Sequence, residues 1–454
     1  MFIKEIYIKE YEQFKETTIN VESVKKNYLS KQILGNINIS ALIEEYGEQR
    51  TDLMRFIALI FHNLQSYHKK VPDNFQLIYT IEDSEGETRE VTLQKDNEGI
   101  YIKVEGIIGR SLMLEFDKET KTYSIKRRLK NYENTVTYEE VENYLPEKVI
   151  FSVFSAHGKY PLNRPYTYKG NPTYINYDIS RIYRGNKLKL ETIQNGIQKF
   201  LELYIEKKEV LDELLRTLSL SFTGKFSINN LDDKDYFIST ATRREFNINS
   251  ENGKEFIENY WNRKKNLHFY DLFFKRNGRD LSLHNMDIGE KVFFIRIFSI
   301  LSSVVDNSIV LIEELELHLS PSWTNQIMNW IKILFEHYKI HLIITTHNHL
   351  IINNLFPENI LFFNKGNVQK PNFNTFLANE REITLRLFKN SRKANSAEKR
   401  AFELIKHYNK GDSLNQDIIE YLGESYIKVL ALARLNKIDR VGKDKNVESD
   451  KQKE

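Results

Sequence analysis

The stretch SIVLIEELELHLSPSW, residues 308–323, decides the fold. Residues 309–312 are an uninterrupted apolar run, which is typical of a strand buried on both faces of a parallel sheet. An amphipathic helical pattern follows at about 321–338, and a second apolar run occupies 341–346. The order strand, helix, strand predicts an α/β fold with two parallel strands in one sheet.

Two adjacent carboxylates, Glu313 and Glu314, come directly after the first of these strands. The carboxyl ends of strands in open α/β sheets face the ligand crevice. One acid of such a pair can coordinate Mg²⁺ while the other activates water, as in proteins that hydrolyse nucleoside triphosphates. The alternative is that the two acids only begin a solvated turn, and residue types alone leave both interpretations open.

Composition excludes several classes of protein. The chain has 454 residues, no cysteine and a formal net charge of +3, which excludes disulfide frameworks, thiol nucleophiles and a global basic surface for nucleic acid. The first residues, MFIKEIYIKEYEQF, alternate charged and apolar side chains and predict a strand rather than a secretory signal. No segment is apolar for long enough to suggest a membrane span, so we expect a soluble, cytoplasmic protein.

The rest of the chain suggests further units. Residues 76–127 hold short alternating runs separated by turns, which predict an antiparallel β-lobe, and residues 190–222 show helical periodicity. A helix at 290–305 precedes the decisive stretch. The predicted organisation is an N-terminal lobe that includes the β-lobe (1–180), a helical insertion (181–260), a C-terminal lobe (261–377), a helical C-terminal region (378–436) and a disordered tail (437–454).

A resemblance to a known family implies that the N-terminal and C-terminal lobes are ATPase lobes. EELELHLSPSW closely resembles the DEPELHLHPxW Walker B and D-loop region of ABC-type ATPase heads, and IHLIITTHNHLI, residues 340–351, resembles their switch strand. The chain is similar to the bacterial SMC-like ATP-binding proteins of the OLD group, many of which are found in anti-phage defence. The resemblance implies an ABC-type ATPase fold in which Glu313 binds Mg²⁺, Glu314 activates water and His347 senses the γ-phosphate.

The resemblance also places a phosphate-binding loop at residues 44–51, EEYGEQRT, where the family has GxxxxGK[ST]. It implies that Gly47, Arg50 and Thr51 contact nucleotide and that the Thr51 hydroxyl also binds Mg²⁺. Two glycine positions are replaced, one of them by Glu44, which adds negative charge where a polyphosphate would lie. An arginine also replaces a compact lysine, so the substitution at Arg50 is not conservative.

A third resemblance covers MDIGEK, residues 286–291, which is similar to the LSSGEK signature that donates a serine hydroxyl and a helix N-terminus to the γ-phosphate across a head-to-head dimer. Gly289 is kept and is predicted to contact nucleotide. Asp287 stands at the serine position, where it places an acceptor-only carboxylate in front of phosphate. All phosphate-facing segments therefore deviate, while the scaffold around them resembles the family.

This combination favours a pseudo-ATPase, which would serve as scaffold or sensor subunit of a prokaryotic anti-phage defence complex. We expect a homodimer or higher oligomer with a separate effector protein, a nuclease or toxin, and doubtful binding of ATP and Mg²⁺. One alternative is an active ATP hydrolase with nucleotide-gated dimerisation, supported by Glu314 and His347. Another is a DNA-binding module independent of nucleotide, for which the candidate contacts are Arg263, Lys264, Lys265, Lys275 and Arg276.

Overall fold

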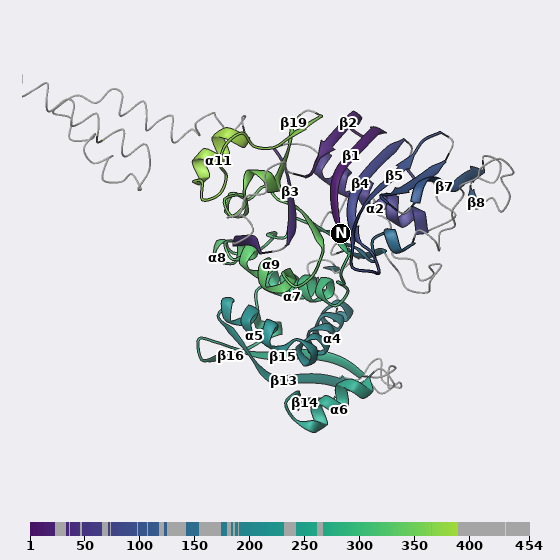
Figure 1. Cartoon of the computed structure of the whole chain (residues 1–454). Coiled ribbons are helices and arrows are strands. Elements are labelled where there is room, and N and C mark those ends of the chain that lie inside the picture. Colours follow the sequence, from purple (N-terminus) through teal and green to yellow (C-terminus); the bar gives the residue numbers. More distant parts are fainter. Residues whose placement is uncertain are drawn as a thin grey trace, which may run out of the picture. The chain divides into compact units, whose positions relative to one another are not determined.

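The computed structural model describes residues 1–22, 33–35, 37–45, 48–65, 71–72, 74–97, 99–106, 108–117, 122–124, 142–153, 174–178, 183–184, 187–188, 190–230, 242–260, 267–364, 366–388 and 432. The chain divides into two units, Met1–Ile383 and Thr384–Glu454. Nearly all described residues belong to the first unit, whose three main sheets are visible in Figure 1.

A seven-stranded, mostly parallel sheet carries the decisive stretch, in the order β10-β9-β17-β18-β3-β19-β20. All neighbouring strands are parallel except β19 and β20. Its strands are β3 (Asn38–Glu44), β9 (Val149–Val153), β10 (Tyr174–Asp178), β17 (Ile309–Glu313), β18 (His341–Thr345), β19 (Ile360–Asn364) and β20 (Asn367–Gln369).

Burial on both faces explains the apolar composition of the inner strands. Every residue of β9, β17 and β18 is buried, as expected for a parallel sheet covered on two sides. The register places Glu313 of β17 beside Thr345 of β18, and Thr345 beside Leu42 of β3. The predicted parallel strand–helix–strand unit is confirmed, and the carboxyl ends of β3, β17 and β18 meet at one edge of the sheet.

A second sheet of seven strands is antiparallel, in the order β2-β1-β4-β5-β6-β7-β8. Burial alternates along β4, so one face packs inward and the other faces solvent. The predicted antiparallel lobe is present and includes the N-terminal strands. Its strands are β1 (Phe2–Tyr11), β2 (Phe14–Asn20), β4 (Phe75–Glu82), β5 (Thr88–Lys95), β6 (Ile100–Val104), β7 (Ile108–Asp117) and β8 (Thr122–Ser124).

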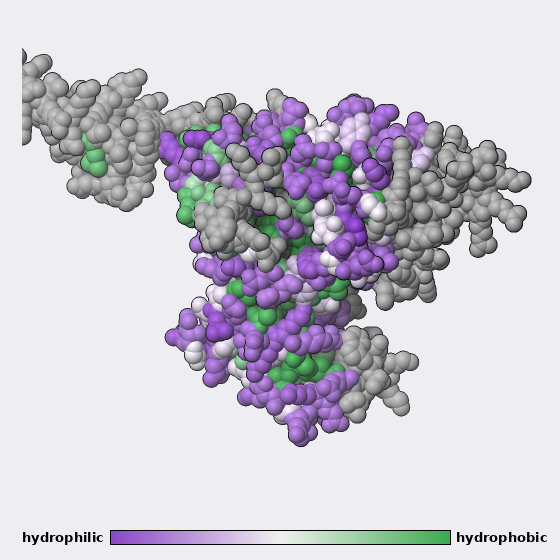
Figure 2. Space-filling model, viewed as in Figure 1, coloured by the Kyte–Doolittle hydropathy of each residue, from purple (hydrophilic) through white to green (hydrophobic). Residues whose placement is uncertain are grey.

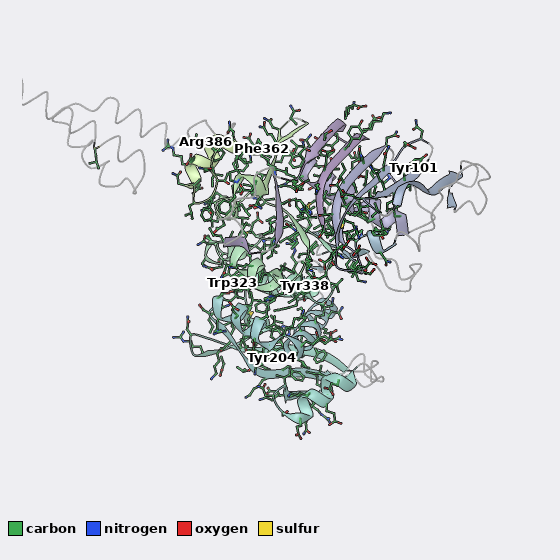
Figure 3. All side chains as sticks on the ribbon, in the orientation of Figure 1. Tyr101, Tyr204, Trp323, Tyr338, Phe362 and Arg386 are labelled. Carbon is green, nitrogen blue, oxygen red and sulfur yellow. The ribbon has the colours of Figure 1, made fainter. Side chains whose placement is uncertain are left out.

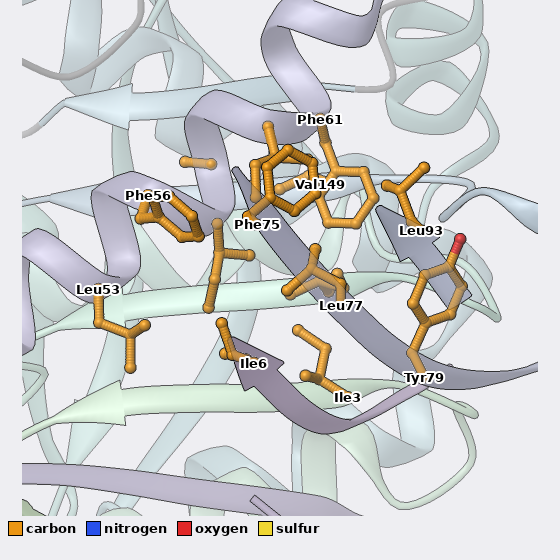
Figure 4. Close-up of a cluster of buried hydrophobic side chains, with 14 of the residues drawn as sticks. Ile3, Ile6, Leu53, Phe56, Phe61, Phe75, Leu77, Tyr79, Leu93 and Val149 are labelled. Atoms are coloured by element: carbon orange, nitrogen blue, oxygen red, sulfur yellow. The ribbon is translucent and has the colours of Figure 1, made fainter. Parts of the chain in front are cut away.

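Helix α2 (Gln49–Gln65) joins these two sheets through one hydrophobic core. Its side chains Leu53, Phe56 and Phe61 pack with residues of β1, β4, β5 and β9, as Figure 4 shows. Phe56 meets Phe75 of β4 edge to face at 5.9 Å between ring centroids. The helix that starts at the candidate phosphate-binding loop is thus held by apolar packing along its whole length.

A third, four-stranded antiparallel sheet follows, in the order β14-β13-β15-β16. Its elements and the helices beside it are α4 (Leu190–Glu206), α5 (Lys208–Thr217), β13 (Leu220–Asn230), β14 (Thr242–Asn247), α6 (Glu251–Tyr260), β15 (Leu267–Arg276) and β16 (Arg279–Ser282). The predicted helices at 190–222 are present as α4 and α5. Helix α5 ends at Thr217 and β13 begins at Leu220, so the prediction of a helical insertion at 181–260 was wrong where β13 and β14 lie. Phe222 and Phe226 of β13 are four positions apart, a spacing that suits a helix as well as a strand.

Aromatic contacts tie this sheet to the parallel one. Phe200 of α4 lies 5.0 Å from Phe222 of β13 and 5.9 Å from Phe274 of β15, between ring centroids. It also lies 4.9 Å from Phe298, which belongs to α7 (Ile288–Leu301). Helix α7 is therefore packed between the third sheet and the carboxyl edge of the parallel sheet.

The remaining described elements are short. They are β11 (Tyr183–Arg184), β12 (Lys187–Leu188), α8 (Pro321–Thr324), α9 (Ile327–Phe335), α10 (His349–Ile352), α11 (Glu380–Leu387) and the 3-10 turns Glu142–Tyr144, Leu283–Asn285 and Pro357–Asn359. The helix expected at 321–338 is two helices. Trp323, labelled in Figure 3, packs edge to face against Trp330 from the second helix, with 5.3 Å between the ring centroids.

The predicted fold class is confirmed: a mixed α/β protein with a parallel sheet, an antiparallel lobe and helices between them. The internal boundaries near 180, 260 and 377 stay a prediction. Most of the predicted helical region 378–436 and all of the tail 437–454 lie outside the described residues. No described helix is long and apolar enough to cross a membrane, and the described surface on the face in Figure 2 is mostly hydrophilic.

A buried histidine links the two large sheets. His341, the first residue of β18, is fully buried. The Ile3 N–H donates to its Nδ1 at 3.1 Å, so the proton sits on Nε2, which lies 2.9 Å from the Ser40 hydroxyl. Burial lowers the pKa of His341 to about 3, and the imidazole is neutral at physiological pH.

This histidine should make stability fall in acid. The unfolded imidazole takes up a proton near pH 6.5 and the folded one only near pH 3, so the free energy of unfolding decreases as pH falls through this window. The slope reaches about 1.4 kcal/mol per pH unit. Urea unfolding at pH 7.5 and pH 5 should show that the free energy of unfolding decreases less in acid for His341→Gln than for the wild type. His337→Gln, at a side chain that is 74% exposed, should keep the wild-type slope.

Candidate functional site

The two adjacent carboxylates lie where the sequence predicts. Glu313 ends β17 and is buried, and Glu314 follows with a positive φ of 44°. The Glu314 N–H donates to the carbonyl and to the hydroxyl of Thr345, both at 3.1 Å. The turn is therefore fixed to β18 at its first residue, and the two acids point from the carboxyl edge of the parallel sheet.

Thr51 and Glu313 meet across 262 residues of sequence. The Thr51 hydroxyl, in the first turn of α2, donates to Glu313 Oε1 at 2.9 Å. A hydroxyl and a carboxylate at one point are hard oxygen ligands, which fit a Mg²⁺ ion that keeps most of its water molecules. The structure thus brings together the two residues predicted as metal ligands. Among the described residues, no group of three or more His, Cys, Asp or Glu side chains is placed to hold a metal ion.

Glu314 is the centre of a charged cluster. Its Oε1 lies 2.9 Å from Arg50 Nη2 and 3.6 Å from His347 Nδ1. The nearby His347 imidazole and the charge of Arg50 hold the pKa of Glu314 below its usual range, although burial acts in the opposite direction. In return, Glu314 raises the pKa of His347. Glu314 thus contacts both His347, the predicted γ-phosphate sensor, and Arg50, which was predicted to contact nucleotide.

Glu44 ends β3 and is the first residue of the predicted phosphate-binding loop, which leads into α2. Its carboxylate is buried and accepts a hydrogen bond from the Arg50 N–H at 3.3 Å. Burial raises the pKa of Glu44, while the backbone N–H groups of Arg50 and Gln49 favour its charged form. An anionic group of the chain itself therefore sits against the N-terminal turn of α2, which is the kind of place that binds anions. Gly47 lies outside the described residues.

The signature-like segment begins α7. Asp287 is the N-cap of this helix and forms a capping box with Glu290. A Cβ at Gly289 would lie 2.0 Å from the His318 carbonyl oxygen, so glycine is required here by close packing of the helix against the turn after β17. Asp287 is exposed and serves the helix, which gives this carboxylate a structural role that the sequence alone did not reveal.

Of the predicted DNA contacts, the structure describes only Lys275 and Arg276 of β15. Lys275 is exposed on β15, whereas Arg276 forms an ion pair with Glu290 at 2.9 Å. Arg263, Lys264 and Lys265 lie outside the described residues. The DNA contact set stays a prediction.

Two further polar residues contact the site and were missed by sequence reasoning. Arg296 of α7 is buried and donates to the backbone carbonyls of Glu313 and Glu314. Glu316 is also buried, and it accepts a hydrogen bond from the Thr346 hydroxyl at 2.6 Å beside His347. A signal for Arg296 exists in the sequence, since it is a single charge inside the apolar run VFFIRIFSIL.

The carboxyl edge of the parallel sheet thus holds the N-terminus of α2, the Thr51–Glu313 pair and the Glu314–His347 pair. The chain belongs to the family described as "AAA domain, putative AbiEii toxin, Type IV TA system", whose model matches residues 10–353. ATP and Mg²⁺ are the general ligands that an AAA-domain family implies. The family match supports the predicted ATPase head and its link to toxin systems, while the narrower OLD group is not shown.

Relatives and solved structures give more distant matches. A protein described as "Retron Vc95 probable ATPase" from Vibrio cholerae serotype O1 biovar El Tor is 25% identical over 177 residues, which cover 36% of this chain and 33% of the relative. An SMC head domain from Thermotoga maritima matches with a TM-score of 0.34 and 10% identity, over 82% of this chain and 98% of that one. The SmcHead bound to the C-winged helix domain of ScpA matches with a TM-score of 0.40 and 9% identity, over 82% and 97%.

Replacing Glu314 should be visible at His347. Because Glu314 raises the pKa of His347, Glu314→Gln should lower that pKa toward the ordinary value for histidine. Titration of the imidazole by nuclear magnetic resonance measures the shift without nucleotide. The matched control is Glu380→Gln, which removes the carboxylate 3.4 Å from His349 and should leave His347 unchanged. An unchanged His347 titration in Glu314→Gln would contradict the cluster.

Proposed function

We propose that this protein is a degenerate, ATPase-like scaffold or sensor subunit of a prokaryotic anti-phage defence complex. It acts as a homodimer or higher oligomer and holds or restrains a separate effector protein, a nuclease or toxin. The family description, with its toxin system, and the retron ATPase among its relatives support this setting. The degenerate character is supported by the geometry at the start of α2.

One observation carries the proposal. The cation and the backbone N–H that would bind phosphate are already bound to carboxylates of the chain itself. The Arg50 side chain is paired with Glu314, and the Arg50 N–H is bonded to Glu44. A carboxylate about 5 Å from one phosphate charge repels it by roughly 3 kcal/mol at an effective dielectric constant of about 20. Such a repulsion would weaken nucleotide binding by roughly a hundredfold or more.

Pairing Arg50 with Glu314 also removes two functions at once. The cation that would neutralise phosphate is neutralised by the acid that would activate water. The acid, with its lowered pKa and a cation at 2.9 Å, is a weaker base toward water than a carboxylate without such a partner. The site is held together without nucleotide, as a scaffold requires.

If nucleotide does enter, the chain has groups to receive it. Thr51 and Glu313 would hold Mg²⁺, which supplies positive charge to the phosphate oxygens. Arg50 would have to leave Glu314, and Glu314 would then face water with His347 beside it. This sequence of side-chain movements is the basis of the second candidate, an active hydrolase with nucleotide-gated dimerisation, which the retained Thr51–Glu313 and Glu314–His347 contacts favour.

Calorimetry with Mg²⁺-ATP separates the two candidates. The wild type should give no binding heat at millimolar ATP, and Thr51→Ala should give none either. Micromolar binding by the wild type that is lost in Thr51→Ala would contradict a pseudo-ATPase. Light scattering supplies the second measurement, since the mass of the wild type should be the same with and without ATP.

Removing the charge at Glu44 should restore affinity. Glu44→Gln takes away the carboxylate against the first turn of α2, so we expect the affinity for Mg²⁺-ATP to rise by about tenfold or more. Calorimetry at millimolar ATP should then detect binding heat that the wild type does not give. The matched control is Glu45→Gln, which removes the same charge one residue further and should change affinity less. Equal affinity of wild type and Glu44→Gln would show that this carboxylate does not oppose phosphate.

A further inference from the structure

Arg296 is a buried cation in the middle of α7. Its side chain is 3% exposed and lies between apolar residues of the helix, including Ile295 and Ile297. Burial lowers its pKa to about 10, so the guanidinium keeps its charge at neutral pH. Burying a charge costs free energy unless its N–H donors find hydrogen-bond acceptors. The acceptors around Arg296 therefore show what this buried side chain does.

The hydrogen bonds of Arg296 go to the ends of two strands. Nε donates to the Ser152 hydroxyl at 2.7 Å, and Nη2 donates to the Ser152 carbonyl at 2.8 Å on β9. Nη1 donates to the Glu314 carbonyl at 3.0 Å, and Nη2 also reaches the Glu313 carbonyl. The planar fork of arginine can join these acceptors simultaneously, which the single ammonium of lysine cannot do.

These bonds act on the residue whose backbone is under constraint. Glu314 has a φ of 44°, in the left-handed region that a side chain other than glycine seldom adopts without support. Thr345 holds its N–H from one side, and Arg296 holds its carbonyl from the other. With both ends of the residue fixed, its carboxylate is directed toward Arg50 and His347.

Helix α7 meets the same turn at a second point. Gly289 packs against the His318 carbonyl, and Arg296 follows seven positions later. Seven residues are about two helical turns, so both contacts lie on one face of the helix. A shift of α7 along or about its axis would therefore be felt at Glu314 through Arg296.

We propose that Arg296 is the positioning residue of Glu314 and couples helix α7 to the charged cluster at the sheet edge. The role does not depend on hydrolysis, because Glu314 must be oriented whether it activates water or pairs with Arg50. The inference therefore stands apart from the proposed scaffold function, and its test requires no nucleotide.

Arg296→Lys is the decisive variant, since it keeps the positive charge but cannot hold all the carbonyls. If Arg296 orients Glu314, the carboxylate moves away from His347 and the pKa of His347 falls by a large part of the shift that Glu314→Gln produces. Arg296→Met is the second variant, because it removes the charge as well as the hydrogen bonds. Loss of a nearby positive charge alone would raise the pKa of His347, whereas loss of positioning would lower it. Nuclear magnetic resonance titration of His347 measures both.

Two controls distinguish positioning from general stability. Ser299→Ala changes another buried polar residue of α7, and Ser152→Ala removes one bond of Arg296 on β9 while leaving its bonds to Glu313 and Glu314. Both should keep the His347 titration of the wild type. The proposal is overturned if folded Arg296→Lys, verified by circular dichroism, titrates at His347 like Ser299→Ala. If Arg296→Met fails to fold, Arg296→Lys alone decides.

Discussion

The parallel pairing of β17 with β18, and of β18 with β3, is the constraint on which the site depends. Their register brings the ends of three strands to one edge, so residues far apart in sequence become neighbours. Thr51 contacts Glu313, and Arg50 contacts Glu314, only because α2 leaves the end of β3 at this edge. The apolar packing of α2 against both large sheets keeps that geometry in place without a ligand.

Electrostatics at this edge then decides what the fold can do. In an anion-binding loop, backbone N–H groups and a cation face outward to phosphate. Here Glu44 takes an N–H at the start of α2, and Glu314 takes the guanidinium of Arg50. The charges that would attract a nucleotide are balanced within the chain, while the family scaffold is retained. This internal balance of charge is what supports the proposed role as a scaffold.

The sequence predicted the sheet and its acids well, because the run at 309–312 has no polar residue and ends at Glu313. It also located Thr51 and His347, which the structure brings to the same edge as the acids. The partner of Arg50 was not predictable, since Glu314 is 264 positions away and the contact depends on strand register. Arg296 carried a visible signal, a charge in an apolar helix, but its carbonyl partners become neighbours only in the folded chain. The strands β13 and β14 were missed because Phe222 and Phe226 of β13 are four positions apart, a spacing that suits helix and strand alike.

The most direct test of a site filled by its own carboxylates is a crystal structure grown with Mg²⁺ and a non-hydrolysable ATP analogue at millimolar concentration. We expect no nucleotide at the start of α2, with Arg50 still paired to Glu314 and the Glu44 carboxylate against the Arg50 N–H. Phosphate density at that turn, with Arg50 turned toward it and Mg²⁺ between Thr51 and Glu313, would contradict the account.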